Sequence, residues 1–383
     1  MEMKKYKLGD IGEVQMCKRI LKEETNKISG IPFYKIGTFG NKADVFISLE
    51  KFKEYKEKFS YPKKGDILIS AAGTIGRTVI YDGSDSYFQD SNIVWIDNDE
   101  TKVLNKYLFY CYKNIHWFTS KGSTILRLYN DNIRNTEIVV PPLESQKKIV
   151  AVLSTLDDKI ALNRRMNAKL EQMAKRLYDH WFVQFDFPNA DGKPYKSSGG
   201  KMEYDEVLKR EIPAGWEVVC FADFIEIGNG KDHSKLPTGN IPVYGSGGFM
   251  RGVTNFLYDG ESVLFPRKGT LNNIMYKNEK FWTVDTMFYS KMKKSHSAIY
   301  VYYTAKQFDF VSMNTGTGVP SMTSVIIKGL PIIKPTQDIL DSYDESIQPI
   351  YKKIHQNEKE TQKLTALRDK LLPLLMNGQV EVK

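Results

Sequence analysis

The chain has 383 residues, of which 41% are hydrophobic and 26% are charged, as in an ordinary globular protein with room for roughly two to four compact units. An excess of 55 Lys and Arg over 46 Asp and Glu gives a net charge of +9, which permits a polyanionic partner without requiring one. The three cysteines have no metal-type spacing, and no apolar run reaches the length of a membrane span, so we expect a cytoplasmic chain with no membrane contact.

Residues 1–143 contain short runs rich in Val, Ile, Tyr and Phe that are separated by glycine-marked turns. This pattern predicts an irregular β-rich domain. A helical spacing between residues 102 and 120 predicts one helix packed on the sheet. A last strand over residues 136–142 ends at two prolines, which can neither extend a ladder nor lie inside a helix.

A long amphipathic segment follows over residues 144–187, and its apolar residues recur at alternating spacings of three and four. Ser154 and Asp157 form a capping-box-like pair, which predicts a short helix to about Leu153 and then a long one. A helix from Thr155 to Phe182 would be roughly 42 Å long and needs a partner for its apolar stripe.

Residues 185–200 are dense in Gly, Pro, Ser and Asp, as expected for a linker. The order of the first domain then recurs over residues 188–335. The Ile-Pro pair at Ile31 is repeated at Ile241, and the Gly-Thr pair at Gly73 is repeated at Gly269. Asp90 is likewise repeated at Asp285, so the sequence predicts a duplicated domain.

The C-terminal region, residues 336–383, contains a second long amphipathic segment whose stripe matches the first after a shift of 194 residues. The fold class we predict is α+β, with two duplicated β-rich domains and two long helices that pair as a coiled coil. Pro349 falls on Thr155 in this alignment, at a first helical position that tolerates proline. The predicted seam residues are Leu156, Ile160, Asn163, Leu170 and Leu177 in the first helix and Ile350, Ile354, Asn357, Leu364 and Leu371 in the second, with Met173 and Leu367 on the same stripes.

Catalytic motifs are absent from the sequence: it has no phosphate loop, no H-E-x-x-H, no nucleophile elbow and no C-x-x-C. The five histidines are scattered and predict no metal site. We therefore expect a binding protein with no catalytic residues.

Polar glycine-rich turns are the best candidates for a binding surface, because small residues, backbone N–H groups and nearby cations suit phosphates and base edges. The same turns could equally be tight connections between strands, and lysines and arginines in loops are more often merely solvated. The predicted DNA-contacting residues are Ser70, Thr74, Arg77, Lys121, Ser123, Arg127 and Asn130 in the first half and Arg267, Lys268, Thr270, Asn272, Asn273, Thr317 and Ser321 in the second.

Several phrases of the chain resemble the DNA-specificity subunit of type I restriction-modification systems. They are PPLESQKKI from Pro141, LSTLDDKI from Leu153, FDFP with GKPY from Phe185, EIPAGWEV from Glu211 and the ending LRDKLLPLLMNGQVEV from Leu367. The resemblance covers essentially the whole chain. One departure is that the second helix is preceded by KPTQDIL, without the P-P-L-E-x-Q form.

The resemblance implies a non-catalytic subunit in which residues 1–143 and 188–335 are target-recognition domains, each reading one half of a split sequence in double-stranded DNA. The long helices of the helical regions, residues 144–187 and 336–383, would pack as an antiparallel coiled coil. They would act as spacers and dock two modification subunits. Those subunits would bring S-adenosylmethionine for adenine methylation, and restriction subunits would add ATP- and Mg-dependent translocation and cleavage. The specificity chain of another restriction-modification type, or a scaffold that binds no DNA, are the alternatives at this point.

Overall fold

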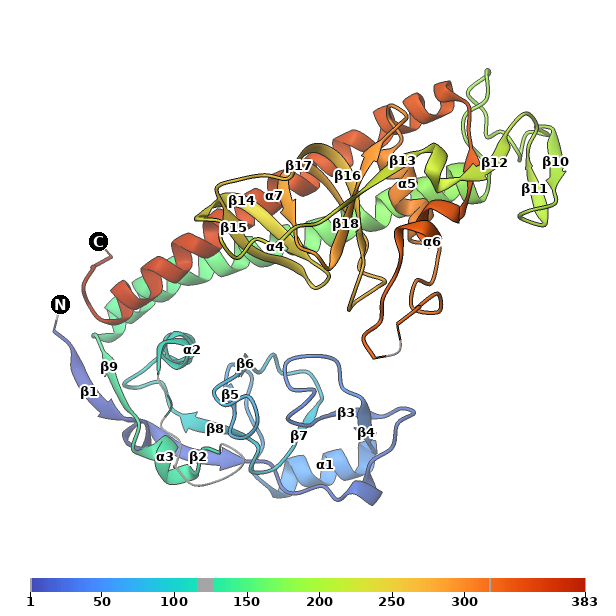
Figure 1. The fold of residues 1–383 in the computed structure, drawn as a ribbon. Helices are drawn as coiled ribbons and strands as arrows, with labels where there is room; N and C mark the ends of the chain where they lie inside the picture. The colour runs from blue at the N-terminus through green and yellow to red at the C-terminus, as the bar shows by residue number, and fades with distance from the viewer. Residues whose placement is uncertain (1, 116, 118–126, 317, 383) are drawn as a thin grey trace. The chain divides into compact units, whose positions relative to one another are not determined.

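A computed structural model describes residues 2–115, 117, 127–316 and 318–382, and these divide into two compact units. The first unit contains residues 1–164 together with residues 358–383, and the second contains residues 165–357. Each unit therefore combines a β-rich domain with part of each of two long helices, as Figure 1 shows by colour. No helix in the described part of the chain is long and apolar enough to cross a membrane.

The first unit contains a four-stranded sheet in the order β2-β8-β5-β6, a three-stranded sheet in the order β4-β3-β7 and the pair β1-β9. Helix α2 packs on the four-stranded sheet through Tyr107, Leu108 and Cys111, and it is the helix expected between residues 102 and 120. The strands are β1 (Lys4–Lys7), β2 (Gly12–Met16), β3 (Ile31–Tyr34), β4 (Val45–Ile47), β5 (Ile67–Ser70), β6 (Thr78–Ile80), β7 (Tyr87–Phe88), β8 (Ile93–Asn98) and β9 (Glu137–Val140). The short helices are η1 (Leu8–Asp10), η2 (Lys22–Glu24), α1 (Leu49–Lys58), α2 (Asn105–Asn114) and α3 (Asn130–Arg134).

The second unit contains a six-stranded sheet in the order β13-β18-β16-β17-β14-β15 and the pairs β10-β11 and β12-β19. Helix α5 packs on this sheet through Ile299, Tyr300 and Val301, against Val263 and Phe265 of β16. The strands are β10 (Met202–Asp205), β11 (Arg210–Pro213), β12 (Glu217–Cys220), β13 (Ile225–Asn229), β14 (Thr238–Gly245), β15 (Gly248–Val253), β16 (Tyr258–Pro266), β17 (Met275–Thr283), β18 (Met287–Met292) and β19 (Pro331–Lys334). The short helices are the π-helical turn η3 (Asp179–Val183), η4 (Phe221–Asp223), α5 (Ala298–Ala305) and α6 (Ser324–Gly329).

The strand registers confirm the predicted duplication. Lys7 lies opposite Glu137 in the β1-β9 pair, and Cys220 lies opposite Pro331 in the equivalent β12-β19 pair. The parallel pairs β3-β7 and β14-β17 also correspond, with Phe33 opposite Tyr87 in the first unit. The connections differ: β3 and β7 belong to a separate three-stranded sheet in the first unit, whereas β14 and β17 belong to the six-stranded sheet of the second. The two β-rich domains therefore share these strand pairs, although their sequences and some of their connections have diverged.

The two long helices are α4 (Leu143–Tyr178) and α7 (Gln337–Met376), and each is continuous. The predicted break near Leu153 is wrong. The hydroxyl of Ser154, the predicted cap, donates to the backbone oxygen of Ala151 at 3.4 Å, so this side chain bonds back along the helix rather than capping a new one. Pro349 lies inside α7 and not at its first position, because α7 begins twelve residues earlier, at Gln337, the counterpart of Leu143.

The helices pair antiparallel in both units. In the first unit Arg368 donates to Asp157 at 2.9 Å, and Asn163 donates to Glu360 at 2.9 Å. In the second unit Asn357 donates to the side-chain oxygen of Asn167 at 2.8 Å. The residue numbers of the partners rise in one helix as they fall in the other, which is the signature of an antiparallel pair.

The predicted seam residues occupy the inner or half-buried positions of both helices. Ile160, Asn163, Ile354 and Asn357 are buried, whereas Leu156, Leu170, Leu177, Ile350, Leu364 and Leu371 are half-buried. Met173 and Leu367, which the sequence placed on the stripes, are 54% and 45% exposed. The fully buried Ala174 and the half-buried Arg368 lie one residue further along, where the coiled-coil period brings the chain to the partner helix.

The Gly- and Pro-rich segment after α4 is packed within the second unit. Phe187 stacks on Trp216 with ring centroids 4.9 Å apart, and the amide of Tyr195 donates to the oxygen of Phe187 at 2.9 Å. Phe185 is 2% exposed. The aromatic residues of this segment therefore anchor it to the second domain, so it does not hang free as a linker.

Gln146, in the first turns of α4, joins this helix to the first β-rich domain. Its side chain is fully buried. Its amide nitrogen donates to the backbone oxygens of Lys102 and Pro141, both at 2.9 Å, and its oxygen accepts from the amide of Leu104 at 2.9 Å. One side chain thus satisfies three backbone groups of the turns around it, which is the structural reason for a glutamine in the PPLESQ phrase.

We expect Gln146→Ala to lower the free energy of unfolding by about 3 kcal/mol, because truncation leaves buried backbone groups without partners. Urea denaturation of the full chain, followed by circular dichroism, measures the change. Gln172→Ala is the matched control, since Gln172 is exposed on the same helix and its loss should cost less than about 0.5 kcal/mol. Equal midpoints for the two variants would show that the Gln146 contacts contribute no stability.

Candidate nucleic-acid interface

The predicted turn after β5 in the first unit is held together by Ser70. This side chain is 1% exposed, its hydroxyl donates to the backbone oxygen of Thr74, and it accepts from the amide of Arg77 at 2.9 Å. The amide of Gly76 donates to the backbone oxygen of Ser70 at 3.0 Å. Ser70 therefore shapes the turn from within, and the residues that the turn presents at the surface are Thr74 and Arg77.

Arg127 lies against this turn. It forms an isolated β-bridge with Ala72, and the amide of the next residue, Leu128, donates to the oxygen of Ala71 at 2.7 Å. The Arg127 guanidinium donates to the backbone oxygen of Ser91 at 3.2 Å. Asn130 is the first residue of α3, three residues after Arg127. The structure thus brings two candidate segments, which are distant in the sequence, to one place.

The second unit repeats this arrangement at equivalent positions. Lys268 forms the isolated β-bridge with Ser321, and the amide of Met322 donates to the oxygen of Arg267 at 2.8 Å. Arg267, Lys268 and Thr270 are exposed, whereas Ser321 is half-buried. The same backbone frame therefore presents an exposed lysine and a serine here, where the first unit presents an alanine and an arginine.

The two asparagines after Thr270 make contacts inside the protein. Asn272 donates to a side-chain oxygen of Asp309 at 3.0 Å, and this hydrogen bond lowers the pKa of the Asp309 carboxyl. Asn273 donates to the backbone oxygen of Ser246 at 2.8 Å. Both amides therefore position the loop, whose exposed polar side chains are Arg267, Lys268, Thr270 and Asn272 itself. Three further predicted residues, Lys121, Ser123 and Thr317, lie outside the described residues.

The structure adds a hairpin turn that the sequence reasoning did not select. This turn joins β14 to β15 and contains Ser246 and Gly247. Gly269, with a φ of +87°, lies so close to it that an added Cβ would come within 2.8 Å of the Ser246 hydroxyl oxygen. Glycine is required here both by its backbone conformation and by this close approach. The Gly-Ser-Gly-Gly run at Gly245 is a typical two-residue hairpin signal and would have located the turn.

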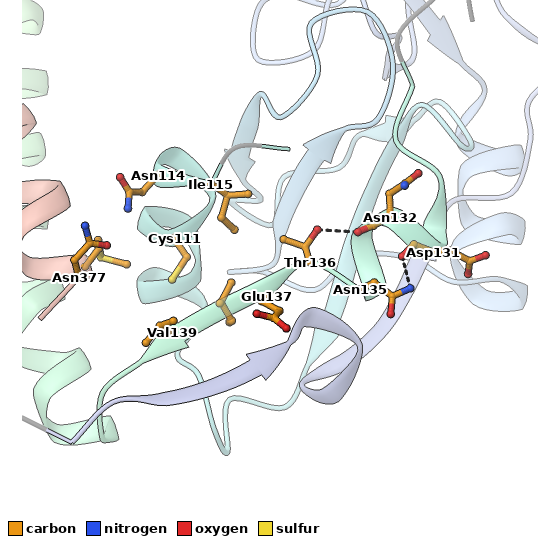
Figure 2. Close-up of a pocket in the computed structure, with 12 residues that line it drawn as sticks. Cys111, Asn114, Ile115, Asp131, Asn132, Asn135, Thr136, Glu137, Val139 and Asn377 are labelled. Carbon is orange, nitrogen blue, oxygen red and sulfur yellow. Dashed lines mark hydrogen bonds between the residues drawn. The ribbon is translucent and has the colours of Figure 1, made fainter. Parts of the chain in front are cut away.

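A pocket of about 640 Å³ lies elsewhere in the first unit, between α2, α3, β9 and the end of α7 (Figure 2). Amide and carboxyl groups line much of it, including those of Asn114, Asn135, Glu137 and Asn377. It contains none of the predicted DNA-contacting residues. In the described part of the chain no three His, Cys, Asp or Glu residues are grouped so that they could hold a metal ion.

The exposed polar side chains described in these two turns include the cations Arg77, Arg267 and Lys268 and the hydroxyls of Thr74 and Thr270. Such groups bind phosphate oxygens and base edges. The geometry of these turns is therefore suited to recognition.

Comparison with known proteins identifies the family. The family described as type I restriction modification DNA specificity domain matches residues 1–172 and 213–366. A putative type I restriction enzyme specificity subunit of Haemophilus influenzae is 58% identical over 182 residues, which is 47% of this chain and 47% of that protein. A type I restriction enzyme specificity subunit of Methanocaldococcus jannaschii is 28% identical over 84% of this chain and 78% of its own length.

A solved structure shares the fold. The crystal structure of a type I restriction-modification system S subunit from M. genitalium superposes with a TM-score of 0.65 at 15% identity, covering 98% of this chain and 96% of that one. The family match extends over both halves of the chain, each of which contains the same frame of strands. The chain therefore belongs to the family of type I restriction-modification DNA specificity subunits.

Proposed function

We propose that each β-rich domain reads one half of a bipartite target in double-stranded DNA. The observation that carries this proposal is the repeated pair of loops, with Ala72 beside Arg127 in one unit and Lys268 beside Ser321 in the other. A shared backbone frame that presents different side chains suits two readers with a common approach to DNA and different sequence preferences. The two half-sites are therefore expected to differ.

In the first unit, we assign base-edge or phosphate contacts to Thr74, Arg77 and Arg127. In the second, we assign them to Arg267, Lys268 and Thr270. Arginine and lysine bind guanine edges in the major groove or phosphates, and threonine hydroxyls bind either. Ser70, Asn272 and Asn273 act through these residues by holding the turns in shape, as their internal hydrogen bonds indicate.

The long helices are the proposed docking surface for two modification subunits. Leu162 and Leu367 in the first unit and Met173 in the second are 42%, 45% and 54% exposed on these helices. Apolar side chains outside the seam suit a surface that a partner covers, which accounts for their periodic spacing. The partners would supply S-adenosylmethionine for adenine methylation, and restriction subunits would supply ATP- and Mg-dependent cleavage, in the cytoplasm where the DNA is accessible.

The purified chain alone should neither bind S-adenosylmethionine nor methylate or cut DNA. The reason is that its sequence lacks the phosphate-loop and methyltransferase-type motifs that such activities need. Equilibrium dialysis with labelled S-adenosylmethionine and a methylation assay, each with and without modification subunits, provide the measurement. Methyl transfer by the chain alone would contradict the proposal.

Specificity should be modular. Exchange of residues 188–335 for the matching domain of another specificity subunit keeps strands β12 and β19 together and should change one half of the methylated motif only. Methylome sequencing of a host that expresses the chimera with the modification subunit reads out both halves. Exchange of residues 1–143 is the reciprocal control and should change the other half. A change in both halves after a single exchange would exclude independent reading.

A further inference from the structure

The β14-β15 hairpin of the second unit carries large apolar side chains at an exposed tip. Gly245 lies opposite Gly248 across a turn formed by Ser246 and Gly247. Phe249 is 64% exposed and Met250 is 53% exposed. Two adjacent large apolar residues at a hairpin tip are a feature that folding alone does not require.

This tip is continuous with the candidate DNA-contacting loop. The oxygen of Ser246 accepts from Asn273 at 2.8 Å, and Gly269 lies against the Ser246 hydroxyl. The same loop presents Arg267 and Lys268 to solvent. The exposed apolar tip and the exposed cations therefore belong to one surface of the second unit.

The hairpin is braced at its base. The Arg251 guanidinium on β15 donates to the backbone oxygens of His233 and Leu236, the latter at 3.0 Å. The ring of Tyr244 packs edge-on against Phe249, with centroids 6.4 Å apart, and its hydroxyl donates to Glu279 at 2.7 Å. These contacts hold the Phe249 ring outward on a defined support.

The equivalent connection in the first unit, between β3 and β4, has a different structure. The β3-β4 hairpin there has a longer loop, in which Phe39 is 1% exposed and Lys35 pairs with Asp44 at 3.0 Å. The Arg77 guanidinium donates to the backbone oxygen of Phe39 at 2.9 Å. An aromatic residue in this connection can thus be buried within the shared frame, so the exposure of Phe249 is specific to the second unit.

We propose that the β14-β15 hairpin enters the major groove and that the Phe249 ring contacts the 5-methyl group of a thymine in the half-site read by the second unit. The inference rests on the proposed function of that domain. The major groove admits a two-stranded β-ribbon, and the thymine methyl is the one apolar group that the groove edge of a base pair offers. Arg267 and Lys268 would bind phosphates or guanine beside it.

The test uses the chain assembled with its modification subunits and a duplex containing the motif found by methylome sequencing. Each thymine of the second half-site is replaced in turn by deoxyuracil, which lacks only the methyl group. We expect one replacement to weaken binding of the wild-type complex about fourfold, since a buried methyl contributes ~0.8 kcal/mol. Phe249→Ala should weaken binding to the thymine duplex at least as much and should be insensitive to that replacement.

Tyr204→Ala is the matched control, because Tyr204 is an aromatic residue of the same unit that is 60% exposed on β10. This variant should keep the wild-type affinity and the wild-type response to deoxyuracil. Phe249→Leu keeps an apolar side chain and should retain part of the response, which separates loss of the contact from loss of the fold.

An equal response of the wild type and Phe249→Ala to every replacement would overturn the inference, as would a wild-type complex that responds to none. A wild-type complex that methylates no bipartite motif would instead contradict the proposed function. The two failures are therefore distinguishable, because methylome sequencing reports failure of the proposed function and the duplex series reports failure of the inference.

Discussion

Both compact units depend on the antiparallel pairing of α4 and α7. The first unit is discontinuous in sequence, because it combines residues 1–164 with residues 358–383 of the C-terminal region, whereas the second is the continuous segment 165–357, which begins in α4 and ends in α7. Leu375 and Met376 of α7 complete the core that contains Ile149 and Leu153. The core of the second unit likewise contains residues of both helices, among them Tyr178 of α4 and Tyr343 of α7. The Tyr343 ring lies 5.6 Å from that of Trp181, in the turn η3 directly after α4. The helix pair is thus part of each domain's core. The helices that act as the spacer are therefore also needed for the domains to fold.

The two helices pair antiparallel in both units, but the side chains that make the contacts differ between the units. In the first unit Asp157 accepts from Arg368 at 2.9 Å and from the Tyr110 hydroxyl at 3.0 Å. The residue 194 positions after Asp157 is Tyr351, which donates to the Tyr303 hydroxyl at 3.1 Å in the second unit. A charged network in one unit therefore corresponds to an aromatic one in the other. Such a difference favours pairing between unlike halves, because a half paired with its own copy would place Asp157 opposite Ala174.

The sequence predicted the duplicated domains and the long helices more accurately than the roles of the residues in the candidate loops. The duplication and the helix stripes follow from spacing, and the one-residue error at Met173 arose because a stripe read by eye does not follow the exact drift of the coiled-coil period. The candidate loops were located from their glycines and cations. The roles of Asn272 and Asn273 depend on contacts with Asp309 and Ser246, which are distant in the sequence, so spacing alone could not distinguish positioning residues from contacting ones.

The loop frame itself explains how specificity can vary while the fold persists. The bonds that join the two loops run between backbone atoms, from Leu128 to Ala71 in one unit and from Met322 to Arg267 in the other, at 2.7 and 2.8 Å. Backbone hydrogen bonds of this kind do not depend on which side chains the bridging residues carry. Substitutions at the bridging positions therefore alter the presented chemistry at little cost in stability. The same holds for the exposed hairpin tip that carries Phe249. Its support comes from Tyr244 and the β-ladder, so the side chain at the tip can change independently of both.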